Sequence, residues 1–275
     1  MQITNGVYQL TSGHGENIGL FSPDPNVFIV AGSEGVAFID TGYGKALEIA
    51  TYKDQLKTLG HPKVIAIILT HRHGDHIGGA KELYDYSGAQ IISSSVEKAG
   101  IESSQYDITI EVGVNDSDTL DLGGVTLEFV FSPGHTMGSM SIFHREAGVL
   151  FTGDTILGKS TTAINPGQGD MGLYMKSLMK LKGYNSLLIG PGHGPPITDT
   201  NHWIDYLIDH RITRESQIMN LILEGNSTVI SLFRAMYFDL DSRLHHSAKG
   251  QIICHLNKLI ADDKVVKNNE TYEVH

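Results

Sequence analysis

The 275-residue sequence contains a single cysteine, Cys254, so no disulfide bond can form within the chain. It has no apolar run of about 18 residues, and we therefore expect no transmembrane helix and no membrane partner. The segment that begins Met1-Gln2-Ile3 lacks the basic and apolar regions of a signal peptide, which predicts a cytoplasmic protein. Cys254 lies in the apolar helical pattern of residues 252–256, where we expect a small buried side chain.

Basic residues are also scarce, because 20 Lys and Arg stand against 31 Asp and Glu, for a net charge of −11. This balance disfavours electrostatic binding of nucleic-acid phosphates by the chain as a whole, although it allows a local basic groove. The hydrophobic share of 40% is that of an ordinary globular protein, and the length suits one large domain or a large domain plus a small one. Histidine, in contrast, is abundant at 14 residues, and it is clustered.

Apolar periodicity predicts that strands and helices alternate along the first 200 residues. The strongest strand signal is Val64–Leu69, which is apolar throughout and rich in β-branched residues. Further strands are predicted at 3–10, 26–31, 36–39, 89–93, 125–131, 140–144, 149–152 and 187–190, and helices at 45–59, 78–86 and 171–182. Many strands, some joined by hairpins and some by helices, indicate sheets whose outer faces are covered by helices.

The pattern changes from about residue 200. Helices are predicted at 203–224, 228–236 and 244–261, with Gly225 as a helix stop. A hairpin follows, in which Asn268-Asn269 forms the turn between two short strands. Three helices and a two-stranded wing make a winged-helix arrangement. We therefore predict one domain over residues 1–203 and a winged-helix domain over residues 204–275.

Four potential metal ligands, His71, His73, Asp75 and His76, directly follow the predicted strand Val64–Leu69. Imidazole nitrogen and carboxylate oxygen are the ligands that zinc prefers outside thiolate sites. His71 and His73 can reach one metal from an extended loop, and Asp75 and His76 can face a second metal from the turn that follows. A polar surface loop could carry one histidine by chance, but four such residues within six positions indicate a metal site.

Three more residues of this kind lie where later strands end. His135, Asp154 and His193 each follow a glycine at the carboxyl end of an apolar run, where sheet proteins commonly build their sites. Each alone could be an ordinary loop residue. Together with the first cluster they supply enough ligands for two metals.

With these seven residues the sequence resembles the metallo-β-lactamase superfamily, whose pattern is His-x-His-x-Asp-His followed by a His, an Asp and a His. The resemblance implies an α+β fold, an αββα sandwich with the site at one edge. It also implies the ligand sets: one metal held by His71, His73 and His135, a second by Asp75, His76 and His193, and Asp154 bridging both. Asp40 matches a family aspartate that supports the metal loop; a simple turn carboxylate is the alternative.

The resemblance also implies a reaction. Two divalent ions, zinc or alternatively manganese or iron, would turn a bridging water into a hydroxide that attacks an electrophilic carbonyl or phosphorus. Asp75 would bind one metal and take part in proton transfer to the leaving group. The sequence holds no Gly-x-Ser-x-Gly motif, and hydrolysis without a covalent intermediate is expected.

The C-terminal part resembles the tail of the β-lactamase-like endoribonuclease group, through Tyr206, His210-Arg211 and His255–Leu259, and Gly153–Gly158 with Tyr174–Leu178 matches the same group. The stretch Ile164–Asp170 departs from it, which leaves the substrate open. Residues 205–275 hold eight Lys and Arg against ten Asp and Glu, so the basic footprint of a DNA reader is missing, and we expect this domain to shape the site.

Several functions therefore compete. The first is hydrolysis of a small ester, thioester or lactone, which suits the acidic chain; the second is single-strand-specific RNA cleavage, which the tail suggests. A weak or promiscuous β-lactamase activity is a third, and an iron-based redox role is disfavoured because no partner domain for it is evident. We expect the glycine-rich segments 12–26 and 159–170 to form the walls of the substrate pocket. The sequence leaves the oligomeric state open, with a homodimer as one possibility.

Overall fold

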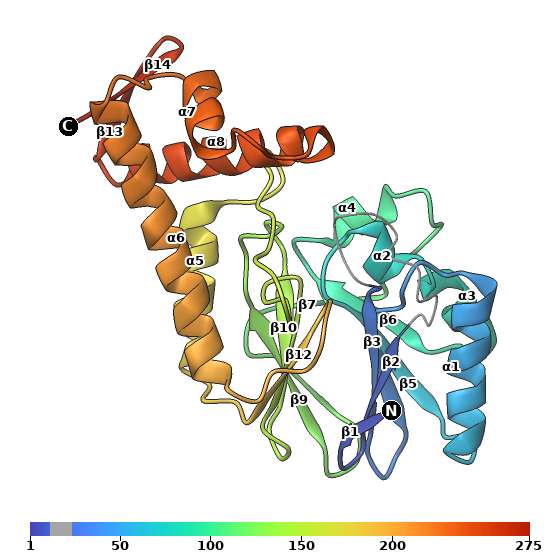
Figure 1. Ribbon diagram of the computed structural model, residues 1–275. Coiled ribbons are helices and arrows are strands. Elements are labelled where there is room, and N and C mark those ends of the chain that lie inside the picture. The colour runs from blue at the N-terminus through green and yellow to red at the C-terminus, as the bar shows by residue number, and fades with distance from the viewer. Residues whose placement is uncertain (12–23) are drawn as a thin grey trace.

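The computed structural model describes residues 1–11 and 24–275. Two β-sheets face each other, and a smaller C-terminal unit of helices stands beyond one end of the sandwich (Figure 1). The first sheet has seven strands in sequence order: β1 (Gln2–Thr4), β2 (Val7–Thr11), β3 (Asn26–Ala31), β4 (Val36–Ile39), β5 (Val64–Leu69), β6 (Gln90–Ser94) and β7 (Val112–Val114). The second has five, in the order β12 (Leu188–Pro191), β11 (Val149–Gly153), β10 (Met140–His144), β9 (Thr126–Phe131) and β8 (Thr119–Asp121).

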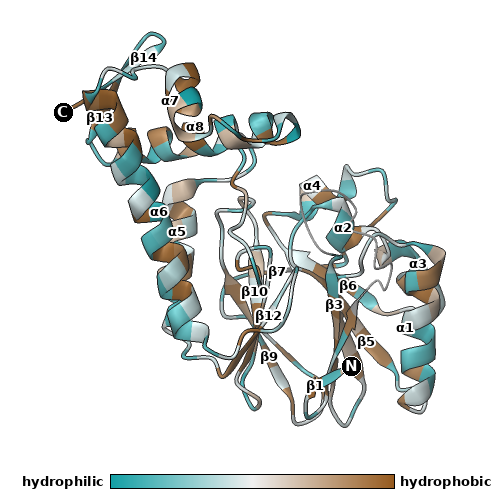
Figure 2. Cartoon of the chain, in the orientation of Figure 1, coloured by the Kyte–Doolittle hydropathy of each residue, from teal (hydrophilic) through white to brown (hydrophobic). Residues whose placement is uncertain are grey.

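Alternate side chains of the strands build separate apolar layers, because successive residues of a strand point to opposite faces of the sheet. In β5, Ile67 and Leu69 pack beneath α1 (Ala46–Thr58) and α3 (Ala80–Ser87), while Ile68 faces the second sheet. The Phe28 and Phe151 rings meet between the two sheets with centroids 4.9 Å apart. Brown, apolar residues are accordingly frequent along the strands (Figure 2). The predicted αββα sandwich is confirmed.

The second sheet is covered on its outer face by α5 (Met171–Lys182) and by the first half of α6 (Thr200–Leu223). Helix α6 is 24 residues long and leaves the sandwich half way along its length (Figure 1). Its second half packs with α7 (Val229–Met236), α8 (His245–Ala261) and the hairpin of β13 (Val265–Asn268) and β14 (Thr271–Val274) around a separate core. The winged-helix domain is therefore confirmed, and α6 runs unbroken through the predicted boundary after residue 203.

The direction of the strands places their ends at the same edge of the sandwich. Strands β9, β11 and β12 run in the same direction, because β10 is antiparallel to both β9 and β11, and β12 is parallel to β11. The loops that follow these three strands, and the loop after β5, therefore share the edge that faces the C-terminal domain. All seven predicted metal ligands lie in these four connections, with Asp75 and His76 in the helical turn that follows the end of β5.

The structure differs from the predicted elements in a few places. The predicted strand 3–10 is two strands, because Gly6, with φ of 70°, makes a turn between them. The predicted helix 78–86 corresponds to α3, and a separate single-turn helix that was not predicted, α2 (Gly74–Ile77), precedes it. The wing turns at Asn269-Glu270, one residue later than expected. The short β7, β8 and α4 (Lys98–Glu102) gave no clear periodic signal. None of the described helices is long and apolar enough to cross a membrane.

Candidate metal centre

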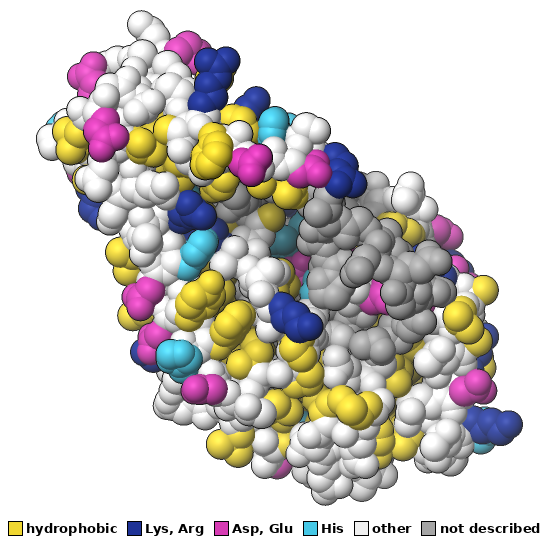
Figure 3. Space-filling model, viewed as in Figure 1, with side chains coloured by type: hydrophobic (Ala, Val, Ile, Leu, Met, Phe, Trp, Pro, Cys, Tyr) yellow, Lys and Arg dark blue, Asp and Glu magenta, His cyan; other side chains and the backbone are white. Residues whose placement is uncertain are grey.

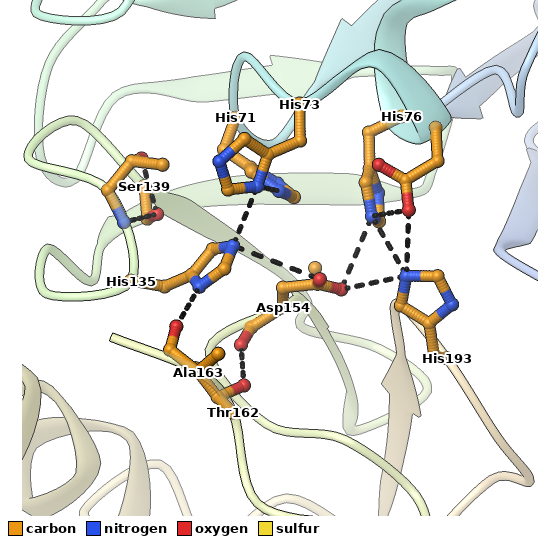
Figure 4. A network of polar contacts seen from close by, with 12 residues as sticks. His71, His73, His76, His135, Ser139, Asp154, Thr162, Ala163 and His193 are labelled. Atoms are coloured by element: carbon orange, nitrogen blue, oxygen red, sulfur yellow. Dashed lines mark hydrogen bonds and ion pairs between the residues drawn. The ribbon is translucent and has the colours of Figure 1, made fainter. Parts of the chain in front are cut away.

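The histidine-rich segment passes from β5 into the single turn of helix α2. His71 precedes this turn, His73 is its N-cap, and Asp75 and His76 lie within it. The seven predicted residues meet here in three overlapping groups (Figure 4): His71 with His73 and His135; Asp75 with His76 and His193; and His71 with His76 and Asp154. In each group one donor atom per residue lies within 4.8 Å of the others.

Hydrogen bonds outside the first group assign the protons of its rings. The Nδ1 atom of His135 lies 2.9 Å from the Ala163 carbonyl oxygen, which can only accept. The Nδ1 atom of His71 lies 3.0 Å from the Thr70 hydroxyl, whose own proton goes to Asp40. Gln168 Oε1 lies 3.3 Å from His73 Nε2 and accepts from it. Each ring thus donates outwards and keeps an unprotonated nitrogen for the group.

These three unprotonated nitrogens point at one another. His73 Nδ1 lies 3.0 Å from His71 Nε2 and 2.9 Å from His135 Nε2. Lone pairs cannot hydrogen-bond to each other, so the arrangement calls for a shared cation. Two ligand nitrogens of one tetrahedral zinc ion lie roughly 3.3 Å apart, since each Zn–N bond is about 2.0–2.1 Å. The donor set and its spacing therefore fit a metal ion.

The second group is similar but includes a carboxylate. His193 Nε2 lies 3.3 Å from His76 Nε2 and 3.2 Å from Asp75 Oδ2. Asp154 stands between the two groups, with Oδ1 3.3 Å from His76 Nε2 and Oδ2 3.8 Å from His135 Nε2. Its Oδ1 atom is buried and accepts no hydrogen bond from any described residue. One oxygen of Asp154 thus faces each group.

Asp40 connects the metal loop to β4. Its carboxylate accepts from the Thr70 backbone N–H at 2.8 Å, from the Thr70 hydroxyl at 2.8 Å and from His76 Nδ1 at 2.7 Å. Asp40 itself has a φ of 60°, an uncommon conformation for a residue with a side chain. These contacts orient two histidines at once, through Thr70 for His71 and directly for His76.

Two glycines let the loops approach closely enough. Gly153 has a φ of 47°, and a Cβ added there would lie 2.4 Å from the Thr70 hydroxyl. A Cβ added to Gly192 would lie 2.3 Å from Asp154 Oδ1. Glycine directly before Asp154 and His193 is thus required by packing between neighbouring loops.

Several supporting residues carried no sequence signal. The Asn26 amide donates to the carbonyls of Pro191 and Gly194 at 2.9 and 2.8 Å, which holds the loop of His193. Buried Glu97 accepts from the Thr136 hydroxyl at 2.5 Å and holds the residue after His135. Both pairings join segments far apart in the sequence, so only the folded chain reveals them.

The C-terminal domain also contacts the site. The buried Arg211 of α6 donates to the Thr162 carbonyl at 2.6 Å, and the Thr162 hydroxyl donates to the backbone carbonyl of Asp154 (Figure 4). Gln251 of α8 donates to the Ile164 carbonyl at 2.8 Å. Ala163, between these two anchored residues, is the outer partner of His135. The predicted wall segment 159–170 is therefore held by α6 and α8, while residues 12–23 of the other predicted wall lie outside the described residues.

Burial and neighbouring charges set the protonation of the groups. Burial lowers the pKa of His71 well below its usual value and that of His135 to about 4. Burial alone would raise the pKa of Asp154, but the imidazoles of His76 and His193 hold it well below its usual range. At neutral pH His71 and His135 are thus uncharged and Asp154 is ionised, which are the forms that bind a metal. For His76 and His193 burial would lower the pKa, but the neighbouring carboxylates raise it above its usual value, so a metal bound there would displace a proton.

Fold and site together define a hydrolase with a His/Asp metal-binding cluster. The chain belongs to the metallo-beta-lactamase superfamily, whose sequence model matches residues 23–193. A second model, the beta-lactamase associated winged helix domain, matches residues 228–272.

Relatives cover most of the chain. It is 30% identical over 261 residues to the beta-lactamase-like protein 2 homolog of Caenorhabditis elegans, which covers 92% of this chain and 84% of that protein. It is 29% identical over 243 residues to an atrochrysone carboxyl ACP thioesterase of Aspergillus terreus, with 81% and 70% covered.

Solved structures agree in fold. A metallo-beta-lactamase family protein from Thermus thermophilus aligns with a TM-score of 0.80 at 20% identity, covering 99% of each chain. A beta-lactamase domain protein from Burkholderia ambifaria aligns at 0.82 and 18% identity, over 100% of this chain and 93% of that one. At these identities the likeness concerns the fold alone.

Proposed function

We propose that the cluster holds two divalent ions. His71, His73 and His135 would bind the first, Asp75, His76 and His193 the second, and Asp154 both. The observation that carries this proposal is the meeting of three unprotonated nitrogens, in which His73 Nδ1 lies 2.9–3.0 Å from the other two. Nitrogen and oxygen donors of this kind favour zinc, with manganese or iron as alternatives.

Bound ions would supply an activated water and a positive centre for the developing negative charge of the substrate. The chain's own residues have separate tasks. Asp154 would keep the two groups in register, because each of its oxygens faces one of them. Asp75 is 23% exposed at its side chain and would carry the proton to the leaving group from the open side of the site.

We propose a small activated acyl compound as the substrate, with thioesters ahead of lactones and simple esters. The thioesterase of Aspergillus terreus among the relatives supports this choice. The net charge of −11 supports it as well, because it disfavours long polyanions. On the face shown in Figure 3, acidic and basic side chains of the C-terminal domain are interspersed, without the continuous basic patch that RNA binding would favour.

The test is a substrate panel on protein whose metal content has been measured. Thioesters, lactones, a β-lactam and single-stranded RNA are each assayed with native protein, after chelation and after zinc or manganese is added back. We expect thioester turnover that chelation abolishes and metal restores. His135→Ala should lose activity at least a hundredfold and about one metal equivalent, while His202→Ala, on the exposed face of α6, serves as the matched control.

Full thioester activity in metal-stripped protein would contradict the metal proposal. If thioesters and lactones do not react and RNA is cleaved in a metal-dependent way, the substrate proposal is wrong and the endoribonuclease function takes its place. We also propose that the chain divides into a catalytic domain of residues 1–203 and a winged-helix domain of residues 204–275, joined within α6.

A further inference from the structure

A pocket of about 600 Å³ lies between the catalytic domain and the C-terminal domain. One wall is the loop with Asn165, Pro166 and Gln168, and the other is formed by Val229 at the start of α7 and by α8. Along α8 the lining residues include His246, Lys249 and Ile253. Ile253 is half-buried at this wall.

The pocket begins beside the metal centre. Gln168 lines it and also accepts from His73 Nε2, the outer nitrogen of a proposed ligand. A molecule whose reacting group lies at the metal centre can therefore extend past Gln168 into the pocket. Its far part would then meet the two basic residues of α8.

The wall on the catalytic side is held in place before any ligand arrives. Gln251 and Cys254 of α8 donate to the Ile164 carbonyl at 2.8 and 3.2 Å. A Cβ added to Gly250 would lie 3.2 Å from Pro166, so the helix and the loop are nearly in contact there. A preformed wall loses little conformational entropy on binding, which favours a site over a chance hollow.

The lining offers groups of three kinds. Gln168 and Asn165 carry side-chain amides, which can pair with amide groups of a ligand. Val229, Pro166 and Ile253 offer apolar surface. Lys249, whose ammonium lies 5.1 Å from the centre of the Phe233 ring, supplies positive charge in a chain of net charge −11.

From this combination of lining groups we propose that the pocket binds the phosphopantetheine arm of an acyl thioester. The arm carries the matching kinds of groups beyond its thioester: two amides, a dimethyl-substituted carbon and a phosphate. The inference rests on the proposed thioester hydrolysis and names its substrate class. Coenzyme A and a carrier protein both present this arm, and they share the chemistry that the pocket recognises.

The experiment compares thioesters of one acyl group on three thiols: 4′-phosphopantetheine, pantetheine and N-acetylcysteamine. The first pair differs by one phosphate, and the third lacks most of the arm. We expect the phosphate to raise kcat/KM about tenfold, which corresponds to about 1.4 kcal/mol and to the lower end of what a hydrogen bond to a charged group contributes. In Lys249→Glu this preference should disappear through KM, while turnover of the N-acetylcysteamine thioester stays within twofold.

Ile253→Trp fills the pocket and should raise KM for both pantetheine thioesters without affecting the short one. Lys57→Glu makes the same charge change on the exposed face of α1 and should leave all three substrates unchanged. Thermal unfolding of each variant shows that it is folded. Thioesters of coenzyme A and of a phosphopantetheinylated carrier protein, compared at equal acyl group, then show which source is preferred.

Equal loss on all three thioesters in both pocket variants, or no effect in either, overturns the inference. If no thioester reacts at all, thioester hydrolysis fails, and calorimetry with free 4′-phosphopantetheine still tests the pocket by itself. Binding that is lost in Lys249→Glu would then support the pocket, and absence of binding would reject it. If Lys249→Glu weakens only the binding of single-stranded RNA, the inference is wrong and the pocket binds a nucleic-acid backbone instead.

Discussion

Asp40 holds two histidines from one position, which makes it sensitive to change. Its carboxylate has three donors around it, and in Asp40→Asn one of them, His76 Nδ1 or Thr70, must face an amide hydrogen. Removal of such an outer partner costs roughly 10- to 100-fold in metal affinity. We expect Asp40→Asn to bind metal that much more weakly in a titration against a competing chelator. Asp54→Asn, on the exposed side of α1, should bind as the native protein does.

Gly192 provides a second test at the scale of single residues. Because a Cβ there would lie 2.3 Å from Asp154 Oδ1, Gly192→Ala must displace the Asp154 carboxylate from one or both groups of proposed metal ligands. We expect activity to fall at least tenfold and one metal equivalent to be lost or weakened. Gly183→Ala, at the end of α5 with an ordinary φ of −62°, is the control. Native metal content and activity in Gly192→Ala would show that Asp154 has no such fixed position.

The sequence could predict the ligand residues because each lies at a strand end with glycine or another ligand beside it. It could not predict their supports. Asn26, Glu97 and Arg211 act through hydrogen bonds to backbone or side chains more than 35 residues away. No local periodicity marks such contacts, so they emerge only when the chain is folded.

Among the elements, α6 links the C-terminal domain to the metal loops. Arg211 is 3% exposed, and its guanidinium lies 5.2 Å from the Tyr174 ring centre while it donates to the Thr162 carbonyl. Arg211→Met leaves that carbonyl without its donor, which costs about 1–3 kcal/mol. Because Thr162 and Ala163 contact Asp154 and His135, we expect kcat to fall about tenfold with little change in KM.

If Arg211 had only a structural role, Arg211→Met would lower thermal stability without changing the metal sites. The visible spectrum of the cobalt-substituted protein separates the two cases, and we expect Arg211→Met to change it. Arg211→Lys should restore part of kcat, since it keeps a cationic donor. Arg234→Met, on the exposed side of α7, should alter neither the spectrum nor kcat.

Helices α6 and α8 are also joined by a buried carboxylate. Burial would raise the pKa of Glu215, but the adjacent His255 imidazole and Lys258 ammonium lower it below its usual 4.5. A lowered carboxylate pKa contributes stability above the unfolded-state value, and this contribution is lost as pH falls through the folded-state pKa. We expect the free energy of unfolding to drop less steeply below about pH 4.5 in Glu215→Gln than in the native protein. Equal slopes in denaturant titrations would contradict this.

At the scale of these elements the sequence predicted well where apolar periodicity was long, as in β5, α5 and α8. It failed where tertiary contacts decide. Helix α6 looks like a helix of the C-terminal domain from residue 203 onwards, yet its first half packs on the second sheet with α5. How a helix is divided between two hydrophobic cores depends on the elements that pack around it. The local sequence of the helix does not contain this information.

For the whole molecule, the proposed ligand sets draw on both sheets. His71, His73, Asp75 and His76 follow a strand of the first sheet, whereas His135, Asp154 and His193 follow strands of the second. Each proposed ion would therefore connect the two halves of the sandwich. A metal that binds only the folded chain stabilises it by RT ln(1 + [L]/Kd), about 4.1 kcal/mol at a thousandfold excess over Kd.

Such a gain corresponds to a rise in Tm of roughly 8–16 °C for a domain of about 200 residues, since 1 kcal/mol shifts Tm by about 2–4 °C. We expect calorimetry to show that Tm falls by this amount on chelation and recovers when zinc is added. The C-terminal core, which holds none of the proposed ligands, would keep its own transition if it unfolds separately. In His76→Ala the shift should shrink to about half, because only the first group keeps its full set. An unchanged Tm after complete metal removal would mean that the two sheets are held together by their apolar core alone.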